Sequence, residues 1–544
     1  TPRRIGLAAV AAVALGLLAS AGWQAREHAR IDAACVAEGQ AIEALWTEER
    51  IAQMREAFLG TGLSFAADSW SRMEGNIDRW VADYARERTA LCRAGELEGT
   101  VEPDLLAKAR DCFDERYQGF EEATNEWTHA DAQLVTRAPA STYDYSPLDG
   151  CTDFTVLERR LALERAEGVS AADRERLREG WQATRSRNHE GDAEGARAQA
   201  HALAEEAVSL GALSLASALS LTECDALMRL HRIDEAQVTC ERAFTQAVVG
   251  SDHEGAFHSA AALSSLASLH RRDRATAKLW LDLAEAHHTF VRAPEGQADG
   301  GLARLHSARA YFAQDFGEFD TAIAEFRQAI AAYVLVQGEY SDMASYLWLS
   351  IAHIAMGQGD YRTAQEAVEE AGRIREAVFG VLHPESIEVE MYRAAILNEL
   401  SPQEVDQAYA RTLEHATATS GAESPLATSV TFDWGRSLKE RKGCEAARER
   451  FEAVIAVITR ATREPGELRP VWYDEAYLLT AGCRLEAGDR EGARTLAQRV
   501  LDESPPIEEG EDAEVSPQIE RARELLAACD AEPDPSTDET PPSP

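Results

Sequence analysis

Lysine is almost missing from this 544-residue chain: only Lys108, Lys278, Lys439 and Lys442 occur among its 55 basic residues. The other basic residues are arginines, a bias typical of a GC-rich bacterial genome. Acidic residues number 94, so the formal net charge at neutral pH is −39. A surface of that sign repels the phosphate backbone of DNA or RNA, which excludes nucleic acid as a partner.

The motifs that most enzymes and metal sites require are missing as well. None of the nine cysteines forms a C-x-x-C pair, the spacing typical of zinc ribbons and thioredoxin-like redox sites. The patterns H-E-x-x-H and G-x-S-x-G and the phosphate-binding P-loop do not occur. Adjacent His287 and His288 would point about 100° apart on a helix, so they cannot easily hold one metal ion. The sequence therefore predicts no catalytic residue, no metal site and no cofactor.

Two short strings resemble protein-kinase motifs but have another explanation. D-F-G at 315–317 matches the magnesium-binding triplet, and H-R-I-D at 231–234 is close to the catalytic-loop motif. They lie 84 residues apart (315 − 231), and no glycine-rich loop or V-A-I-K-type strand precedes them. Gly317 and His231 each fit the turn position of a helical repeat, so we assign them no catalytic role.

Only one long apolar run is present, at residues 5–23, a stretch of 19 residues (23 − 5 + 1) without a charge. As a helix with a rise of about 1.5 Å per residue it would be about 28 Å long, close to the hydrocarbon thickness of a bilayer. Arg3 and Arg4 precede the run and Trp23 ends it. We therefore expect a transmembrane helix with its N-terminal side in the cytoplasm.

This interpretation would place residues 24–544 outside the cytoplasm, in a single-pass protein of the inner membrane. The small-residue string A-S-A at 19–21 leaves open a secretory signal that is cleaved there. A buried helix of a soluble protein is the third alternative.

The nine cysteines fit a protein that is exported, because oxidising compartments allow them to pair. Buried free thiols remain the alternative, since connectivity cannot be deduced from sequence alone. Their local order along the chain predicts four disulfides and leaves Cys529 unpaired: Cys35–Cys92, Cys112–Cys151, Cys224–Cys240 and Cys444–Cys483.

From about residue 165 to 502, apolar residues follow a helical period and strand-like alternation is rare. A pattern recurs in this stretch, in which a glycine precedes an alanine by five residues and small or apolar residues follow four and seven positions later. Gly317, Ala322, Phe326 and Ala329 form a clear copy. Further copies, some of them weaker, centre on Ala196, Ala236, Ala277, Ala364, Ala408, Ala447 and Ala493.

This pattern resembles the tetratricopeptide repeat, a helix–turn–helix unit whose glycine marks the turn and whose alanines let the two helices approach closely. Successive alanines lie 39 to 46 residues apart, more than the usual period of about 34 residues, which is similar to repeats of the kinesin-light-chain type. His383-Pro384 fits that subtype, whose inter-repeat loop often carries His-Pro. The resemblance implies an all-α fold with a right-handed α-solenoid of about eight helix pairs.

Composition divides the chain into further segments. Apolar faces that carry Trp46, Phe58, Trp80 and Tyr84 predict core helices ahead of the repeats. Pro, Ser and Gly predict a linker before the repeats, and an acidic Pro-rich composition predicts disorder at the end. The predicted segments are a cytoplasmic stub at 1–4, a transmembrane helix at 5–23, a disulfide-linked non-repeat helical region at 24–150, a linker at 151–164, the repeat array at 165–505, a linker and C-terminal capping helix at 506–529, and a disordered tail at 530–544.

The chain as a whole resembles the extracytoplasmic half of transmembrane serine/threonine kinases of the myxobacterial type. In that family a cytoplasmic kinase domain leads into one membrane helix, then an outer helical region with paired cysteines, then tetratricopeptide repeats. A start at Thr1 instead of Met fits a kinase domain upstream, but no kinase domain is present in this sequence. The residues that carry the resemblance are Arg3, Arg4, Cys35, Trp46, Cys112 and Cys151.

The resemblance implies a non-catalytic sensor module, with kinase activity only in a longer parent protein. A protein or peptide ligand in the repeat groove would favour a homodimer. The alternatives are a stand-alone secreted or periplasmic scaffold and, with no motif in its favour, an enzyme in the outer region. Aromatic and arginine side chains favour interaction hot spots, and the family register implies these partner-binding positions: Arg304, Ser307, Tyr311, Tyr346, Leu349, His353, Glu390 and Arg393.

Overall fold

The chain is helical throughout the residues that the computed structural model describes, with no β-strand among them. This confirms the all-α prediction. Contacts divide the chain into two compact units, Thr1–Gly380 (unit 1) and Val381–Pro544 (unit 2), which we describe one at a time. The backbone is described for residues 2–143, 148–189, 192–293, 298–460, 471–503 and 517–530.

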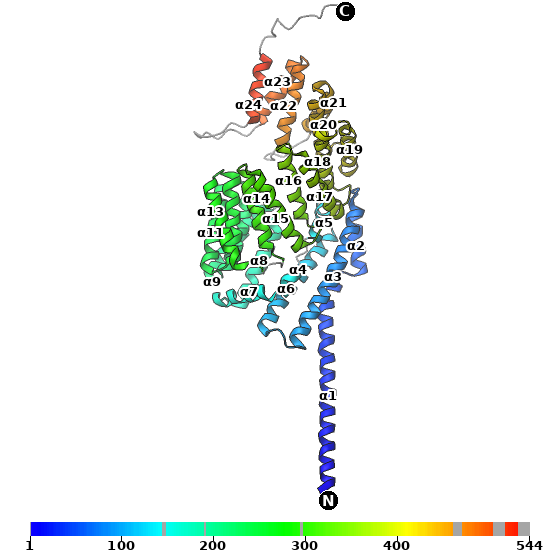
Figure 1. Cartoon of the computed structure of the whole chain (residues 1–544), viewed down its shortest axis with the longest axis vertical. Coiled ribbons are helices and arrows are strands. Elements are labelled where there is room, and N and C mark those ends of the chain that lie inside the picture. Colours follow the sequence, from blue (N-terminus) through cyan, green and yellow to red (C-terminus); the bar gives the residue numbers. More distant parts are fainter. Residues whose placement is uncertain are drawn as a thin grey trace, which may run out of the picture. The chain divides into compact units, whose positions relative to one another are not determined.

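The first part of unit 1 is a group of helices ahead of the repeats, coloured blue to cyan in Figure 1. Its helices are α1 (Pro2–Gln40), the 3₁₀ turn η1 (Ala41–Leu45), α2 (Glu48–Gly60), α3 (Ala66–Glu96), α4 (Pro103–Trp127), α5 (Ala132–Tyr143), α6 (Asp149–Thr152) and α7 (Phe154–Glu167). The disulfide Cys35–Cys92 joins α1 to α3, and Cys112–Cys151 joins α4 to α6. These bridges fix neighbouring helices that the chain order alone would leave free to slide.

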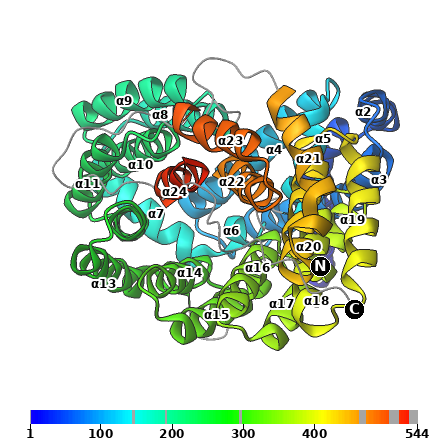
Figure 2. The same cartoon turned by 90° about the horizontal axis from the view of Figure 1, so that it is seen from above.

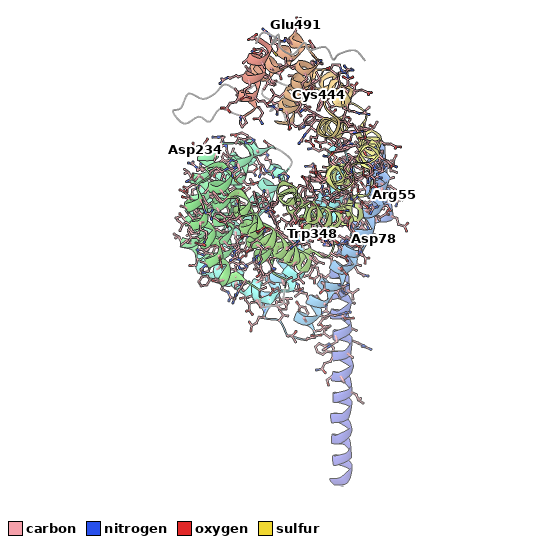
Figure 3. The ribbon with its side chains drawn as sticks, turned by 45° about the horizontal axis from the view of Figure 1, so that its top comes forward. Arg55, Asp78, Asp234, Trp348, Cys444 and Glu491 are labelled. Carbon is pink, nitrogen blue, oxygen red and sulfur yellow. A yellow bond between two sulfur atoms is a disulfide. The ribbon has the colours of Figure 1, made fainter. Side chains whose placement is uncertain are left out.

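Aromatic side chains fill the centre of this part. Phe120 on α4 is fully buried, with its ring centroid 5.1 Å from that of Trp80 and 6.0 Å from that of Trp46. The ring of Trp127 also packs against Phe120, with the two ring centroids 6.3 Å apart. The indole Nε1 of Trp46 donates a hydrogen bond of 2.7 Å to Asp78, which is labelled in Figure 3. The predicted core role of Trp46 is therefore confirmed.

The first helix corrects the prediction of a membrane span. Among the helices of the described residues, none is both long and apolar enough to cross a membrane. This finding contradicts the transmembrane helix predicted at 5–23, together with the cytoplasmic stub and the inner-membrane location that depended on it. α1 is one helix of 39 residues and its later turns carry Arg26, Glu27 and Arg30, whose burial in hydrocarbon would be costly. The side chains of residues 2–17 lie outside the described residues.

Helix pairs make up the rest of unit 1. Figure 2 shows them following one another around an arc, with α7 on its inner side. A π-helical turn, η2 (Leu266–His270), continues α12. The pairs are α8 (Ala171–His189) with α9 (Ala193–Leu210), α10 (Leu213–Arg229) with α11 (Ile233–Gly250), α12 (His253–Ser265) with α13 (Arg274–Val291), α14 (Gly300–Asp315) with α15 (Phe319–Gln337), and α16 (Asp342–Gly357) with α17 (Tyr361–Phe379).

Buried alanines bring the two helices of each pair together. In each pair we call the helix that comes earlier in the chain the first helix and the other the second helix. The predicted alanines of this unit all lie on second helices and are fully buried: Ala196, Ala236, Ala277, Ala322 and Ala364. A methyl group at the contact permits a short distance between helix axes. The predicted repeat register is thus confirmed.

The turns inside the pairs also follow the predicted pattern. Gly317 and Gly359 adopt φ values of 77° and 75°, five residues before their alanines. His231 and Arg272 take the same left-handed conformation at the equivalent positions, with φ of 56° and 51°, although a Cβ atom disfavours it. The kinase-like strings therefore begin or end at repeat turns.

The segment predicted as a linker at 151–164 is instead mostly helical, as α7. The Asp153 side chain caps this helix by accepting hydrogen bonds from the backbone N–H groups of Thr155 and Val156. Near the C-terminal end of α7, Glu164 Oε1 lies 2.6 Å from Lys108 Nζ of α4, and this ion pair holds that end of the helix against α4. The linker prediction was wrong because the Pro, Ser and Gly residues that favour a linker lie just upstream, whereas Asp153 caps a helix that begins at Phe154.

Unit 2 contains α18 to α24, of which α18 to α23 form pairs with the same alanine pattern. Ala408, Ala447 and Ala493 are buried on the second helices. The disulfide Cys444–Cys483 joins α21 to α22 (Cys444 is labelled in Figure 3). The bounds are α18 (Pro384–Leu400), α19 (Val405–Ser420), α20 (Pro425–Lys442), α21 (Cys444–Arg460), α22 (Val471–Glu486), α23 (Arg490–Glu503) and α24 (Pro517–Asp530).

The end of the chain agrees in part with the prediction. α24 packs against α22 and α23 and buries Ile519 and Ala522, as expected of a capping helix. The predicted linker at 506–516 and the predicted disordered tail from 531 onward lie outside the described residues. With Cys224–Cys240, which joins α10 to α11, the structure contains the four disulfides that cysteine order predicts, and Cys529 is a buried free thiol.

A contact between His288 of α13 and Asp299, the residue that caps α14, ties the two helices together. Asp299 accepts hydrogen bonds from the backbone N–H groups of Ala293 (2.9 Å) and Leu302 (2.9 Å), and its Oδ1 lies 3.2 Å from His288 Nε2. Burial acts to raise the pKa of Asp299, but these bonds outweigh it and lower the pKa to about 2. Asp299 therefore stabilises the fold only while it is ionised.

Asp299→Asn is expected to lower the free energy of unfolding by about 1–3 kcal/mol at pH 5, because a charged acceptor of several hydrogen bonds is lost. Since the folded pKa lies below the ordinary value of about 3.9, the stabilisation is complete above pH 4 and disappears as the pH falls to 2. Urea unfolding of both proteins at pH 5, 3.5 and 2.5 measures it. The exposed Asp320→Asn is the control, and a difference that does not shrink with falling pH would contradict the assignment.

Candidate binding cavity

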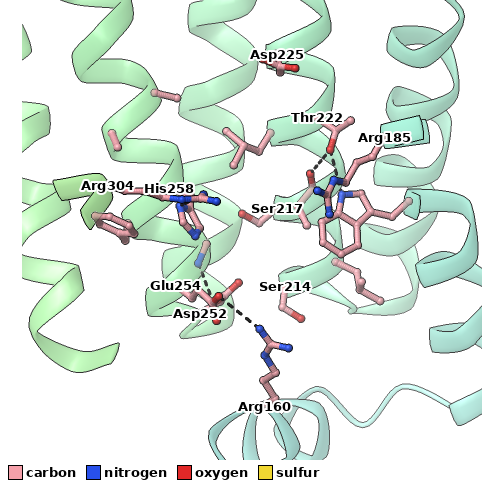
Figure 4. Close-up of a pocket in the computed structure, with 18 of the residues that line it drawn as sticks. Arg160, Arg185, Ser214, Ser217, Thr222, Asp225, Asp252, Glu254, His258 and Arg304 are labelled. Atoms are coloured by element: carbon pink, nitrogen blue, oxygen red, sulfur yellow. Dashed lines mark hydrogen bonds and ion pairs between the residues drawn. The ribbon is translucent and has the colours of Figure 1, made fainter. Parts of the chain in front are cut away.

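A cavity of about 820 Å³ opens on the first helices of successive pairs in unit 1. Its walls come from α8, α10, α12 and α14, and side chains of α4 and α7 close one side. Figure 4 shows the part of the cavity between Arg185 and Arg304, with Arg160 of α7 at one side. Ligand pockets in proteins usually fall between about 300 and 1,000 Å³. The cavity is therefore large enough for a small molecule or for a few residues of a peptide.

Three of the predicted partner-binding residues line this cavity together. Arg304, Ser307 and Tyr311 follow one face of α14. Tyr311 is 41% exposed and packs edge-on against Phe326, with ring centroids 5.1 Å apart. Ser307 is buried and donates a 3.0 Å hydrogen bond to the carbonyl of Ala303, so its hydroxyl serves the helix.

The next predicted set, on α16, does not line the cavity. Tyr346 is 42% exposed, with the Arg375 guanidinium 4.8 Å from its ring centroid. Leu349 is buried in the core, and His353 is exposed.

The remaining two predicted residues, Glu390 and Arg393, lie on α18 in unit 2. Glu390 is largely buried, with His415 Nδ1 2.9 Å from its Oε1, and Arg393 is half-buried. Glu390 thus joins its own helix pair, α18 and α19.

Most charges of the cavity wall are paired. At the end near α4, Lys108 lies 2.6 Å from Glu164, and Arg178 lies 2.7 Å from Glu115. Arg160 of α7 reaches Glu254 of α12 at 3.5 Å, a contact drawn in Figure 4. The carboxylates that line the cavity are Asp111, Glu115, Glu164, Asp225, Asp252 and Glu254.

Two arginines on opposite walls lack such partners. In the described part of the chain, neither Arg185 of α8 nor Arg304 of α14 forms an ion pair with a carboxylate. The Arg185 guanidinium lies 5.2 Å from the ring centroid of Trp181, whose indole donates a 3.0 Å hydrogen bond to Thr222. Burial lowers the pKa of Arg185, and repulsion by Arg304 lowers it further.

A half-buried histidine, His258, lies beside Arg304. Arg304 Nη1 donates to His258 Nδ1 at 3.4 Å. Burial, and then repulsion by Arg304, lower the pKa of His258 to about 4. The ring is therefore neutral at pH 7, and because its Nδ1 accepts, its Nε2 carries the proton and can donate.

Sequence reasoning missed Trp181, Arg185, His258 and Arg160. The repeat register could have found the first two. Trp181 and Arg185 precede Ala196 by 15 and 11 residues, the spacings of Ser307 and Tyr311 before Ala322. No register points to Arg160, because α7 is not a repeat helix.

The histidines weighed as metal ligands have other partners. His288 contacts Asp299, and His287 Nδ1 lies 3.0 Å from His253 Nδ1. Within the described residues, no group of three or more His, Cys, Asp or Glu side chains is arranged to hold a metal ion.

Comparisons with known proteins give only distant likenesses. No family model matches the chain, and no curated protein matches it. Among solved structures, BtubC from P. vanneervenii is 18% identical over 45% of this chain and 97% of that chain, with a TM-score of 0.33. A tetratricopeptide repeat protein from Parabacteroides merdae is 12% identical over 65% of this chain and 98% of that one (TM-score 0.36), and yeast Tom70 is 12% identical over 78% and 95% (TM-score 0.34). TM-scores this low do not establish a shared fold. The assignment of a repeat architecture therefore rests on the helix pairs of this chain.

Proposed function

We propose that the protein is a non-catalytic scaffold that binds a segment of another protein on the first helices of its repeats. The observation that carries this proposal is the cavity, because four consecutive first helices contribute to a single concave site. Solenoids of helix pairs present their concave faces to partners. The tetratricopeptide-like register supports the same choice of face.

The chemistry of the wall suits a protein ligand. Tyr311, Trp181 and Arg304 combine aromatic surface with a guanidinium, the side chains most enriched at interaction hot spots. The Tyr311 ring already packs against Phe326, so binding of a partner costs little side-chain conformational entropy at this position. We infer an extracytoplasmic location from the four disulfides, which persist in oxidising compartments.

Tyr311→Ala is expected to weaken binding of a peptide selected against the full chain from a random displayed library by 10-fold or more, since truncating a hot spot costs about 2 kcal/mol. Calorimetric titration of the purified peptide into both proteins measures the change. Tyr340→Ala removes a comparably exposed tyrosine outside the cavity and is the control. Equal affinities for Tyr311→Ala and the unaltered protein would contradict the proposal.

The resemblance to the outer regions of receptor-type kinases adds a finer proposal, in which partner binding regulates a signalling kinase. It is supported by Cys35, Cys112 and Cys151, which match that family's outer helical region. An open reading frame with kinase motifs, upstream of and in frame with the codon for Thr1, would support it further.

A further inference from the structure

Among the basic residues that line the cavity, Arg185 and Arg304 are the two with no ion pair to a carboxylate of the described residues, although the chain has a net charge of −39. Each other lysine or arginine of the cavity wall within the described residues has a carboxylate within 3.5 Å: Lys108, Arg160, Arg174 and Arg178. Solvent reaches both unpaired side chains inside the cavity. Their charges are therefore available to an anion that enters it.

The two guanidinium groups are placed to act on one ligand. Figure 4 shows Arg185 and Arg304 on opposite sides of the cavity, with Ser217 between them in that view. The ring of Trp181 holds the Arg185 guanidinium in place by a cation–π contact. Since Arg304 already disfavours the charged form of Arg185, an anion between them would relieve repulsion as well as form hydrogen bonds.

His258 adds a neutral donor to the same wall. Its Nδ1 is occupied by Arg304, which fixes the proton on Nε2. Arg116 of α4 also feels these charges: burial lowers its pKa, Glu115 acts against that shift, and repulsion by Arg160 and Arg185 lowers the pKa further. The donors thus come from three helices, α8, α12 and α14.

We propose that this cavity binds a phosphate group between the guanidinium groups of Arg185 and Arg304. A carboxylate is planar, and a single guanidinium satisfies both of its oxygens. A phosphate directs its oxygens tetrahedrally and carries a charge of about −1.5 to −2 at pH 7, so it can receive donors from two walls and balance both arginines. Inorganic phosphate and a phosphate monoester share this chemistry.

The cavity offers room beyond the phosphate itself. Its volume of about 820 Å³ is much larger than a bare anion needs, and Leu215, Leu221 and Phe257 supply apolar surface. This inference goes beyond the proposed scaffold function, because the phosphate site needs no protein partner. A failure to bind phosphate would leave peptide binding through Tyr311 untouched.

The test titrates inorganic phosphate into the full chain at pH 7.5 and constant ionic strength, with affinity measured by calorimetry. Arg185→Met and Arg304→Met are each expected to weaken phosphate binding about 10- to 100-fold, the range for losing hydrogen bonds to a charged group. Arg185→Lys keeps the positive charge but loses the planar, bidentate donor geometry of the guanidinium, so its phosphate affinity is expected to lie between those of the unaltered protein and Arg185→Met. Far-UV circular dichroism verifies that each variant is folded.

Arg362→Met is the matched control, because Arg362 has the same charge but is 89% exposed on α17, away from the cavity. O-phosphoserine and glutarate are the comparison ligands. Tighter binding of O-phosphoserine than of inorganic phosphate assigns an ester, and the reverse assigns free phosphate; both support the proposal. Glutarate binding as tightly as phosphate, or equal phosphate affinity in Arg185→Met and Arg362→Met, would overturn it.

Discussion

Replacing Phe120 by alanine is expected to lower the free energy of unfolding by about 3–5 kcal/mol, the range for truncating a fully buried aromatic ring. The Phe120 ring touches three indoles, those of Trp46, Trp80 and Trp127. Its removal costs the burial of the ring and leaves a cavity that rigid indoles cannot close. Urea unfolding followed by tryptophan fluorescence measures the loss, because these indoles report on the affected cluster.

Phe319→Ala provides the matched control. Phe319 lies at the start of α15 and is 39% exposed. Its truncation is expected to change stability by about 0.5 kcal/mol or less, as for a surface substitution away from special features. If both variants lost the same stability, the aromatic cluster would not be a core of unit 1.

The repeat architecture was predictable because its signal is local and periodic. An alanine such as Ala322 contacts the other helix of its own pair, and the turn residue Gly317 precedes it by a fixed five residues. The small residue at the helix contact and the residue at the turn therefore both lie within one repeat unit of the sequence. The same register placed Arg304 and Tyr311 on a shared face of α14, where the cavity is found.

The closure of the cavity was not predictable in this way. Arg160 reaches the cavity from α7, which lies on the inner side of the arc of helix pairs (Figure 2), and no local spacing encodes that position. Register also cannot separate a groove residue from a packing residue. Leu349 occupies the inward position of α16 and is buried in the core.

The transmembrane helix predicted from the apolar run at 5–23 was wrong for a different reason. Hydropathy over a window counts the residues within the window and ignores how the helix continues. α1 runs on without a break to Gln40, where its side chains serve the fold. Cys35, for example, is fully buried in its disulfide with Cys92 of α3.

Removal of this disulfide, by Cys35→Ala with Cys92→Ala, is expected to destabilise unit 1 by about 4 kcal/mol, from the loop entropy of a bridge of this span. The bridge closes 57 residues of sequence. The Cys224–Cys240 bridge closes only 16, so its removal is expected to cost less, about 3 kcal/mol. Thermal and urea unfolding of the two double variants, without reductant, measures both losses.

The loss should be a property of the bridge and not of a missing thiol. Cys529→Ala removes a cysteine that has no disulfide, and it is expected to leave the sensitivity to dithiothreitol unchanged. The Cys35/Cys92 variant should instead lose part of that sensitivity, because one bridge is already absent. A variant without Cys35 and Cys92 that unfolds at the same urea concentration as the unaltered protein would show that contacts between α1 and α3 hold the two helices together unaided. The case for an oxidising compartment would then rest on the other three bridges, of which Cys112–Cys151 fixes α6 directly ahead of α7, the helix that closes the cavity.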